Sequence, residues 1–279
     1  MLFDPPPNNN CPICSGEGYA ISSKGEYAFA TQCECVPQCV RCNGTGIVSV
    51  VKDGARRTGR CRCQKLPDRI QLFNYAKLPV LQGHNSFQNF RHINKGATLA
   101  VKSCNSWIRE FNAKKASKGL VLSGEVGRGK THLLIAIVKT LIFEFGVRAR
   151  FIEFSRLLSI LRDGYSRGES NSELLSQLAT VPILAIDELG KGRLTDWELS
   201  IIDEVVSRRY NAMGIILGTT NYSWEPPTGK GVANLSEDFS SQTLGDRVGP
   251  RVFSRLQEIC YFAPVQGQDF RALRPQRMN

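Results

Sequence analysis

One run of the sequence combines an apolar strand, a loop and the start of a helix: Leu120-Val121-Leu122-Ser123-Gly124-Glu125-Val126-Gly127-Arg128-Gly129-Lys130-Thr131-His132-Leu133-Leu134. Its loop has the pattern G-x-x-x-x-G-K-[ST], which in this strand–loop–helix context indicates a phosphate-binding loop. The three glycines let backbone amides curl around phosphate groups. They do so at a helix N-terminus, whose dipole favours anions.

Two side chains of this loop have predictable chemical roles. The Lys130 ammonium is expected to pair with the β- and γ-phosphates of ATP, and the Thr131 hydroxyl is expected to ligate Mg²⁺. The other predicted nucleotide contacts come from the rest of the loop and the first turn of the helix: Gly124, Glu125, Val126, Gly127, Arg128, Gly129 and His132. The sequence therefore predicts ATP and Mg²⁺ as ligands.

Two later apolar runs end in polar residues. Residues 181–186 are typical of a parallel strand buried on both faces, and Asp187-Glu188 follows them. Ligands bind beyond the carboxyl ends of such strands, so Asp187 suits the Mg²⁺ shell and Glu188 suits polarisation of the attacking water. Residues 214–218 predict another strand, which ends in Thr219-Thr220-Asn221, and a polar residue of this run is expected to reach the γ-phosphate or the water. A turn cap is the alternative for the run.

A row of arginines lies near the C-terminus. Arg247, Arg251 and Arg255 share one helical face by their spacing of four, unless Pro250 starts a new helix. One interpretation is a trans-acting arginine finger that completes the site of a neighbouring subunit. The alternative is a solvated basic face.

Eight of the ten cysteines lie in the first 63 residues and form a repeat. Each unit has the spacing C-x2-C, eighteen residues, C-x-C, and the second unit follows the first by 28 positions: Cys11, Cys14, Cys33, Cys35, then Cys39, Cys42, Cys61, Cys63. Two sets of four thiols suit two tetrahedral zinc ions, with a disulfide scaffold as the alternative. Lys24-Gly25 and Asp53-Gly54 predict a hairpin between the pairs of each unit. The spacing leaves open whether each zinc ion takes ligands from one unit or from both.

The composition narrows the class of protein. The chain has 279 residues, with 36 Lys and Arg against 25 Asp and Glu and a formal net charge of +11, which favours an anionic partner such as nucleic acid. No apolar run approaches the ~20 residues of a membrane span, and the first residues are no signal peptide. We therefore expect a cytoplasmic protein without a membrane partner. Residues 39–66 hold seven basic residues against one acidic residue. Contact with nucleic acid and neutralisation of zinc–thiolate charge both remain open for them.

These motifs, in this order, resemble the AAA+ ATPases and more narrowly the DnaC/DnaI replicative helicase loaders and the IstB transposition ATPases. The resemblance covers roughly residues 69–271, and its further signatures are Leu78-Pro79, Ser86–Phe90, Arg209-Tyr210 and Gly267–Arg271. It implies Walker A at residues 124–131 and Walker B at Asp187-Glu188. It also implies sensor I at Asn221 and an arginine finger at Arg255. The implied catalytic residues are Glu188, Lys130, Asn221 and Arg255.

The resemblance also implies the architecture. We expect an α/β fold, a P-loop NTPase with a five-stranded parallel sheet of order 5-1-4-3-2. No C-terminal helical lid is expected, because the chain ends soon after the last strand. The expected domains are a zinc-binding domain (1–66), a connector (67–95) and the ATPase domain (96–279). Residues 11–18 and 39–46 resemble the C-x-x-C-x-G-x-G units of DnaJ-type cochaperones.

The function implied is that of an ATP-dependent helicase loader. Such a protein would bind single-stranded DNA, act on a ring-shaped replicative helicase, form an ATP-dependent homo-oligomer and hydrolyse ATP weakly without DNA or partner. Two inserted helices are expected at 155–165 and 172–178. Arg156 and Arg162 in the first of them, and Arg167 just after it, would contact phosphates, with a solvated face as the alternative. The zinc module is the candidate partner-binding face. An IstB-like helper of a DNA transposase and a zinc adaptor with a nucleotide switch are the alternative functions.

Overall fold

The computed structural model describes residues 3–113, 117–168, 170–192, 195–225 and 242–270, and the chain divides into two compact units. The cysteine-rich unit comprises Met1–His84 with Lys139–Val147, and the P-loop unit comprises Asn85–Val138 with Arg148–Asn279. The expected zinc-binding segment, residues 1–66, lies within the first unit, whereas the expected connector, residues 67–95, is shared between the two.

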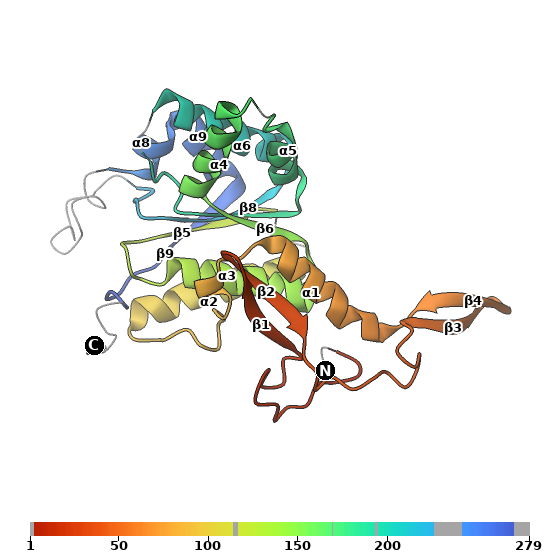
Figure 1. The fold of residues 1–279 in the computed structure, drawn as a ribbon. Coiled ribbons are helices and arrows are strands. Elements are labelled where there is room, and N and C mark those ends of the chain that lie inside the picture. The colour runs from red at the N-terminus through yellow and green to blue at the C-terminus, as the bar shows by residue number, and fades with distance from the viewer. Residues whose placement is uncertain (1–2, 114–116, 169, 193–194, 226–241, 271–279) are drawn as a thin grey trace. The chain divides into compact units, whose positions relative to one another are not determined.

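The centre of the P-loop unit is a five-stranded, all-parallel sheet (Figure 1). Its strands are β5 (Gly119–Ser123), β6 (Ala149–Glu153), β7 (Ile183–Asp187), β8 (Ile215–Thr220) and β9 (Cys260–Pro264). They lie in the order β6-β7-β8-β5-β9, so the predicted order 5-1-4-3-2 is confirmed. Every residue of β5 and β7 is buried, which accounts for their unbroken apolar sequence.

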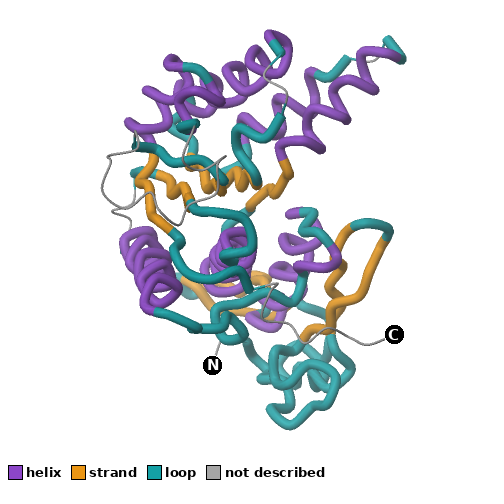
Figure 2. The backbone as a smooth tube through the Cα atoms, turned by 90° about the vertical axis from the view of Figure 1, so that its left-hand side faces the viewer, coloured by secondary structure: helices purple, strands orange, loops and turns teal. Residues whose placement is uncertain are grey.

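Helices cover both faces of this sheet, as Figures 1 and 2 show. On one face lie α2 (Lys95–Asn112) and α3 (Lys130–Thr140), and on the other lie α4 (Phe154–Ser166), α5 (Ser172–Thr180), α6 (Asp196–Asn211), α8 (Leu244–Val248) and α9 (Pro250–Ile259). Because all five strands are parallel, their carboxyl ends meet at one edge of the sheet. The polar residues predicted to bind nucleotide follow β5, β7 and β8, so that edge is where they gather.

Arg209 fastens α6 to the sheet from inside. Its side chain is 1% exposed, and its guanidinium donates to the carbonyl oxygens of Ala179, Val181, Pro182 and Ile215. Burial lowers the pKa of this guanidinium to about 10. A single arginine therefore joins the end of α5, the segment before β7 and the first residue of β8. In the Arg209-Tyr210 signature, Arg209 thus has a structural role inside the fold, away from the nucleotide motifs.

Two antiparallel hairpins form the first part of the cysteine-rich unit, and both were predicted. They are β1 (Tyr19–Lys24) with β2 (Tyr27–Gln32), and β3 (Ile47–Lys52) with β4 (Ala55–Arg60). The short turns η1 (Arg62–Gln64) and η2 (Val80–Gln82) and the π-helical turn η3 (Leu141–Phe145) belong to the same unit.

Helix α1 (Lys65–Ala76) occupies part of the segment that the sequence analysis assigned to the connector. Its buried residues Leu66, Ile70 and Phe73 are spaced to share one side of the helix, and the Phe73 ring lies 5.8 Å from the ring of Phe143 in η3. The helix is therefore part of the core of the cysteine-rich unit.

Within the part of the chain that the structure describes, none of the helices is both long enough and apolar enough to cross a membrane.

Candidate nucleotide site and cysteine clusters

The phosphate-binding loop joins β5 to α3 at the carboxyl edge of the sheet. Lys130 is 7% exposed, and its ammonium donates to the carbonyl oxygen of Glu125 at 2.7 Å. Arg128 is ion-paired with the Glu125 carboxylate. Gly127 has φ +79°, and a Cβ there would lie 1.9 Å from Oδ1 of Asp269. Only glycine satisfies both conditions at that position.

The two predicted magnesium ligands meet across this edge. The Thr131 hydroxyl lies 3.0 Å from both carboxylate oxygens of Asp187, at the end of β7. The Thr219 hydroxyl, from β8, donates to Oδ1 of Asp187 at 2.5 Å. Burial raises the pKa of the Asp187 carboxyl to about 6, against the effect of both hydroxyls. A hydroxyl beside a carboxylate suits Mg²⁺, which would neutralise phosphate charge there.

Glu188 follows Asp187 in a left-handed conformation, with φ +57°. Its backbone N–H donates to the Thr219 hydroxyl at 2.9 Å, and its carboxylate is paired with Lys191. Lys191 also lies 3.9 Å from Glu153, at the end of β6. The pairing with Glu188 raises the pKa of Lys191. The sequence analysis placed Thr219 at the end of a strand without its contacts to Asp187 and Glu188, and it missed Lys191. In the sequence, Thr219 is marked only by its position at the end of β8, and Lys191 only by its position in the loop after Walker B.

Asn221 comes directly after β8, beside the start of the phosphate-binding loop. The Gly124 N–H donates to the carbonyl oxygen of Thr220 at 3.3 Å, and the Ser123 hydroxyl donates to that of Tyr222 at 2.7 Å. Asn221 is half-buried between these two contacts. The structure thus brings the predicted sensor residue to the same edge as Lys130.

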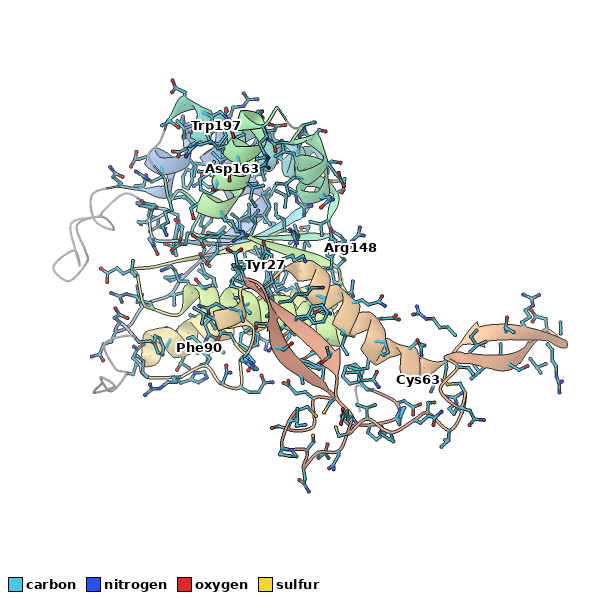
Figure 3. The ribbon with its side chains drawn as sticks, in the orientation of Figure 1. Tyr27, Cys63, Phe90, Arg148, Asp163 and Trp197 are labelled. Atoms are coloured by element: carbon cyan, nitrogen blue, oxygen red, sulfur yellow. The ribbon has the colours of Figure 1, made fainter. Side chains whose placement is uncertain are left out.

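An aromatic cluster adjoins the loop, and the sequence analysis did not predict it. The Phe90 ring lies 5.2 Å from the His132 ring and 5.5 Å from the Phe270 ring (Phe90 is labelled in Figure 3). His132 Nε2 is 2.8 Å from the Ser86 carbonyl oxygen. The Phe270 N–H donates to the Gly127 carbonyl oxygen at 3.0 Å. Two distant signatures, Ser86–Phe90 and Gly267–Phe270, therefore meet at the loop, where the Phe90 ring is buried at 5% exposure and packs against the first turn of α3. Arg271 lies outside the described residues.

The arginine row is divided between two helices. α8 ends at Val248 and α9 starts at Pro250, so Arg247 does not share a helical face with Arg251 and Arg255. Arg247 donates to the carbonyl oxygens of Gly190 and Gly192, just after Walker B.

Arg255 is bound within its own chain. Its guanidinium donates to Oδ1 of Asp203 at 2.8 Å and to the Ser207 hydroxyl at 2.6 Å, both on α6, and its side chain is 22% exposed. Arg251 lies 3.7 Å from the same Asp203 and is 72% exposed. Arg255 therefore carries out at least one structural role, between α6 and α9.

The inserted helix α4 presents aromatic and basic side chains together. The Arg162 guanidinium lies 5.1 Å from the centre of the Trp197 ring and 3.6 Å from a Glu198 carboxylate oxygen. The ring of Tyr165, which is 54% exposed, lies 6.3 Å from the Trp197 ring (Trp197 is labelled in Figure 3). Trp197 and Tyr165 were not predicted as site residues.

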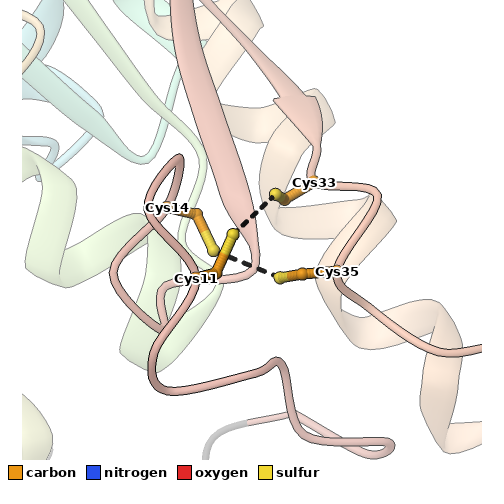
Figure 4. Close-up of side chains that lie close together, drawn as sticks. All are labelled: Cys11, Cys14, Cys33 and Cys35. Atoms are coloured by element: carbon orange, nitrogen blue, oxygen red, sulfur yellow. Dashed lines mark hydrogen bonds between the residues drawn. The ribbon is translucent and has the colours of Figure 1, made fainter.

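The eight cysteines form two clusters, each within one repeat. The ligand atoms of each cluster lie within 4.8 Å of one another. The clusters are Cys11, Cys14, Cys33 and Cys35, shown in Figure 4, and Cys39, Cys42, Cys61 and Cys63. All eight are free thiols. The question that the spacing left open thus has a geometric answer: the hairpin inside each repeat returns the chain, so that the second pair meets the first.

The surroundings of the thiols fit a metal ion. The N–H of Gly18 donates to Sγ of Cys14 at 3.4 Å, and the N–H of Gly46 donates to Sγ of Cys42 at 3.3 Å. Backbone donors lower the pKa of the Cys11 thiol to about 7. Four thiols with amide support are the donor set of a structural tetrahedral zinc site.

The order of the parallel sheet and the meeting of Thr131 with Asp187 at its carboxyl edge define an AAA+ ATPase, an enzyme that hydrolyses ATP. The chain belongs to the family of IstB-like ATP-binding proteins, whose model matches residues 65–259. Residues 1–64, which hold both hairpins and both cysteine clusters, precede the matched segment.

Relatives in this family include replicative helicase loaders. The replicative helicase loader DnaC of Escherichia coli strain K12 is 29% identical over 203 residues, which cover 72% of this chain and 76% of DnaC. DnaC of Buchnera aphidicola subsp. Schizaphis graminum is 34% identical over 170 residues, or 60% and 62% of the two chains. The crystal structure of the DnaC helicase loader matches with a TM-score of 0.54 and 26% identity, covering 65% of this chain and 97% of that one. DnaI, at 20% identity and a TM-score of 0.51, shares the fold.

Proposed function

We propose that this protein is an ATP-dependent helicase loader that binds ATP, Mg²⁺ and single-stranded DNA and acts on a ring-shaped replicative helicase. The observation that carries the proposal is the similarity to DnaC, which spans 72% of the chain and includes the nucleotide site. Cytoplasmic location and ATP-dependent homo-oligomerisation are part of the same proposal.

In the nucleotide site, each residue has a defined task. Lys130 and the loop amides bind the phosphates, and Thr131 with Asp187 would hold Mg²⁺, which supplies charge neutralisation when bound. Glu188 accepts the proton of the attacking water. Asn221 orients that water from the end of β8. The contacts of Thr219 with both acidic residues fix the geometry of the Walker B pair.

Binding of single-stranded DNA is supported by α4. Arg156, Arg162 and Arg167 supply positive charge on this helix and at its end. The exposed Tyr165 and the Trp197 ring beside Arg162 add surfaces on which bases stack. Basic side chains interleaved with aromatic rings are the combination that single-stranded nucleic acid requires.

Zinc binding gives the first testable prediction. Purified protein should contain two zinc ions per chain, because each cysteine cluster is a complete ligand set. Cys11→Ser should lose one ion and unfold its own repeat, and Cys39→Ser should lose the other, since neither cluster borrows ligands. Metal analysis of the wild type and both variants measures this. Protein without zinc whose cysteines are oxidised in pairs, or one substitution that removes both ions, would contradict it.

The loader activity gives the second prediction. A helicase ring cannot enter a closed circle of single-stranded DNA without opening. With the ring helicase of the same organism, we expect helicase to be retained on such a circle only when this protein and ATP are present. Lys130→Ala should abolish the retention. Gel filtration of the circle measures it.

A transposase helper is the second candidate, favoured by the family whose model matches the chain. That function predicts no retention of helicase, but ATP-dependent stimulation of a transposase encoded beside the gene. A nucleotide-switched adaptor predicts assembly without turnover of ATP.

A further inference from the structure

The two hairpins of the cysteine-rich unit are structural copies of each other. In the first, Tyr19 lies opposite Gln32, and in the second, 28 residues later, Ile47 lies opposite Arg60. The Cys33 N–H donates to the Gly18 carbonyl oxygen at 2.9 Å, and the corresponding bond from Cys61 to Gly46 is 2.8 Å. Residues 28 positions apart therefore occupy equivalent sites on equivalent faces.

One face of the first hairpin is covered by a helix and a helical turn. Tyr19 stacks on Phe143 of η3, with 4.1 Å between ring centres and 6° between planes. On the same face, Ala28 and Ala30 are each 1% exposed. The Asn74 side chain of α1 accepts from the Ala30 N–H at 2.7 Å and donates to its carbonyl oxygen at 3.0 Å. An amphipathic helix thus packs on this face and clamps its edge strand.

The equivalent face of the second hairpin is uncovered. It carries Ile47 and Val51, which are 59% and 71% exposed, and Arg60 and Arg56 lie directly opposite them. In Figure 3, no side chain from another described element of the cysteine-rich unit reaches the outer half of this hairpin. We call this face, defined by Ile47, Val51, Arg56 and Arg60, the open hairpin face. Ile47 and Val51 lie at the two ends of the face with Ser49 between them, so the face offers a partner two separate aliphatic contacts.

The differences between the two copies indicate the charge of the partner. Ala28 and Gln32 in the first hairpin are replaced by Arg56 and Arg60 in the second. Arg60 already forms an ion pair with Asp68 of α1, so a helical carboxylate suits this row of arginines. Arg60 also lines a groove of about 440 Å³ with three further basic residues, Arg62, Lys65 and Arg69, and two acidic ones, Asp4 and Asp68, so basic side chains outnumber acidic ones there.

A protein helix fits this face better than nucleic acid does. β3 and β4 contain no aromatic residue on which a base could stack. Phosphates would meet the arginines but leave Ile47 and Val51 exposed, whereas a helix with apolar and acidic positions covers both kinds of side chain.

We propose that the open hairpin face docks an acidic amphipathic helix of a protein partner, in the way that α1 covers the first hairpin. The inference deepens the proposed function, on which it rests for the identity of that partner as the replicative helicase. The two cysteine repeats then have different tasks: the first is closed by the chain itself, and the second receives the helix of another protein.

The test uses full-length protein and a labelled, designed helical peptide with Leu and Phe on one face and Glu on the other. A second peptide with Lys in place of Glu is the charge control. We expect the acidic peptide to bind at least tenfold more tightly than the basic one. Val51→Glu and Arg56→Glu should each weaken acidic-peptide binding at least tenfold. Fluorescence anisotropy measures the dissociation constants.

Matched variants on the opposite face separate docking from a general effect on the hairpin. Val50→Glu and Arg57→Glu make the same chemical changes one residue away, on the other face, and should alter peptide binding less than twofold. Unchanged zinc content in all four variants shows that the repeat remains folded. Equal effects on both faces, or no preference for the acidic peptide, would overturn the proposal. So would loss of oligonucleotide binding instead of peptide binding.

The same four variants with the purified ring helicase distinguish this inference from the proposed function. If the wild type binds the acidic peptide but not the helicase, the assignment as a helicase loader fails and the docking face stands. If the wild type binds the helicase and Val51→Glu binds it equally well, the docking face fails and the loader function stands.

Discussion

Glu188→Gln should bind ATP with near wild-type affinity and hydrolyse it about 10²–10⁴-fold more slowly. The amide keeps the shape of the side chain but cannot accept the proton of the attacking water. Asp187 stays in place, because its contacts with Thr131 and Thr219 do not involve the Glu188 side chain. Phosphate release measures turnover, and equilibrium binding of a fluorescent ATP analogue measures affinity.

Two control variants show whether the loss of turnover is specific to the Glu188 carboxylate. Lys130→Ala should lose ATP binding itself, because the charge that pairs with the phosphates is gone. Glu204→Gln makes the same isosteric change on α6, where the carboxylate is paired with Arg208, and should leave turnover unchanged within twofold. Normal turnover in Glu188→Gln would show that another group acts as the base, and Lys191, which holds Glu188 in the structure, would then need examination.

The strands of the parallel sheet were predictable because a strand that is buried on both faces needs apolar residues at almost every position. β5 and β7 are buried at every position, and each appears as an uninterrupted apolar run. Polar residues then mark the carboxyl edge, so Lys130, Asp187 and Asn221 could be assigned to one site without coordinates. The order of the strands came from the family resemblance, not from these patterns.

What the sequence did not reveal depends on contacts between distant segments. Phe90 and Phe270 meet at the phosphate-binding loop although 180 residues separate them; each lies in a signature of the family, but neither signature indicates what it contacts. Thr219 was seen only as part of a strand end, because its role exists through Asp187 and Glu188. The break at Gly249, with φ +85°, separated Arg247 from the arginine row that regular helical spacing predicted.

For the cysteine repeats, the sequence predicted the local hairpins but not which thiols group together in space. The turn residues Lys24-Gly25 and Asp53-Gly54 correctly predicted both hairpins. The spacing of the cysteines left the grouping of the thiols open, because pairs from one unit or from both satisfy it equally. The antiparallel register decides the matter: Tyr19 opposite Gln32 places residues 14 and 33 at the same end of the hairpin. Helix α1 was missed although Leu66, Ile70 and Phe73 have helical spacing, because turn-like residues follow them at Leu78-Pro79.

Arg255→Ala should retain ATP affinity and lose turnover about 10³-fold or more, if Arg255 completes the site of a neighbouring subunit. An arginine finger acts on charge that develops in the transition state, so its loss leaves ground-state binding intact. Mixing provides the decisive measurement. An Arg255→Ala subunit keeps its nucleotide pocket, and a Lys130→Ala subunit keeps its arginine. Each should be nearly inactive alone, and together they should recover part of the activity.

The bond between Arg255 and Asp203 makes a second variant necessary. If Arg255 only joins α9 to α6, then Asp203→Asn should lower turnover and melting temperature together, as Arg255→Ala does, because both variants lose the ion pair between the helices, although the bond of Arg255 to Ser207 survives in Asp203→Asn. If Arg255 acts in trans, Asp203→Asn keeps the guanidinium and should retain most of the turnover, whereas Arg255→Ala should not. A mixture that stays inactive while both variants still assemble would assign Arg255 to the contact between α6 and α9. Asp203 is therefore the residue whose replacement separates the structural role of Arg255 between α6 and α9 from the catalytic role that the family resemblance implies.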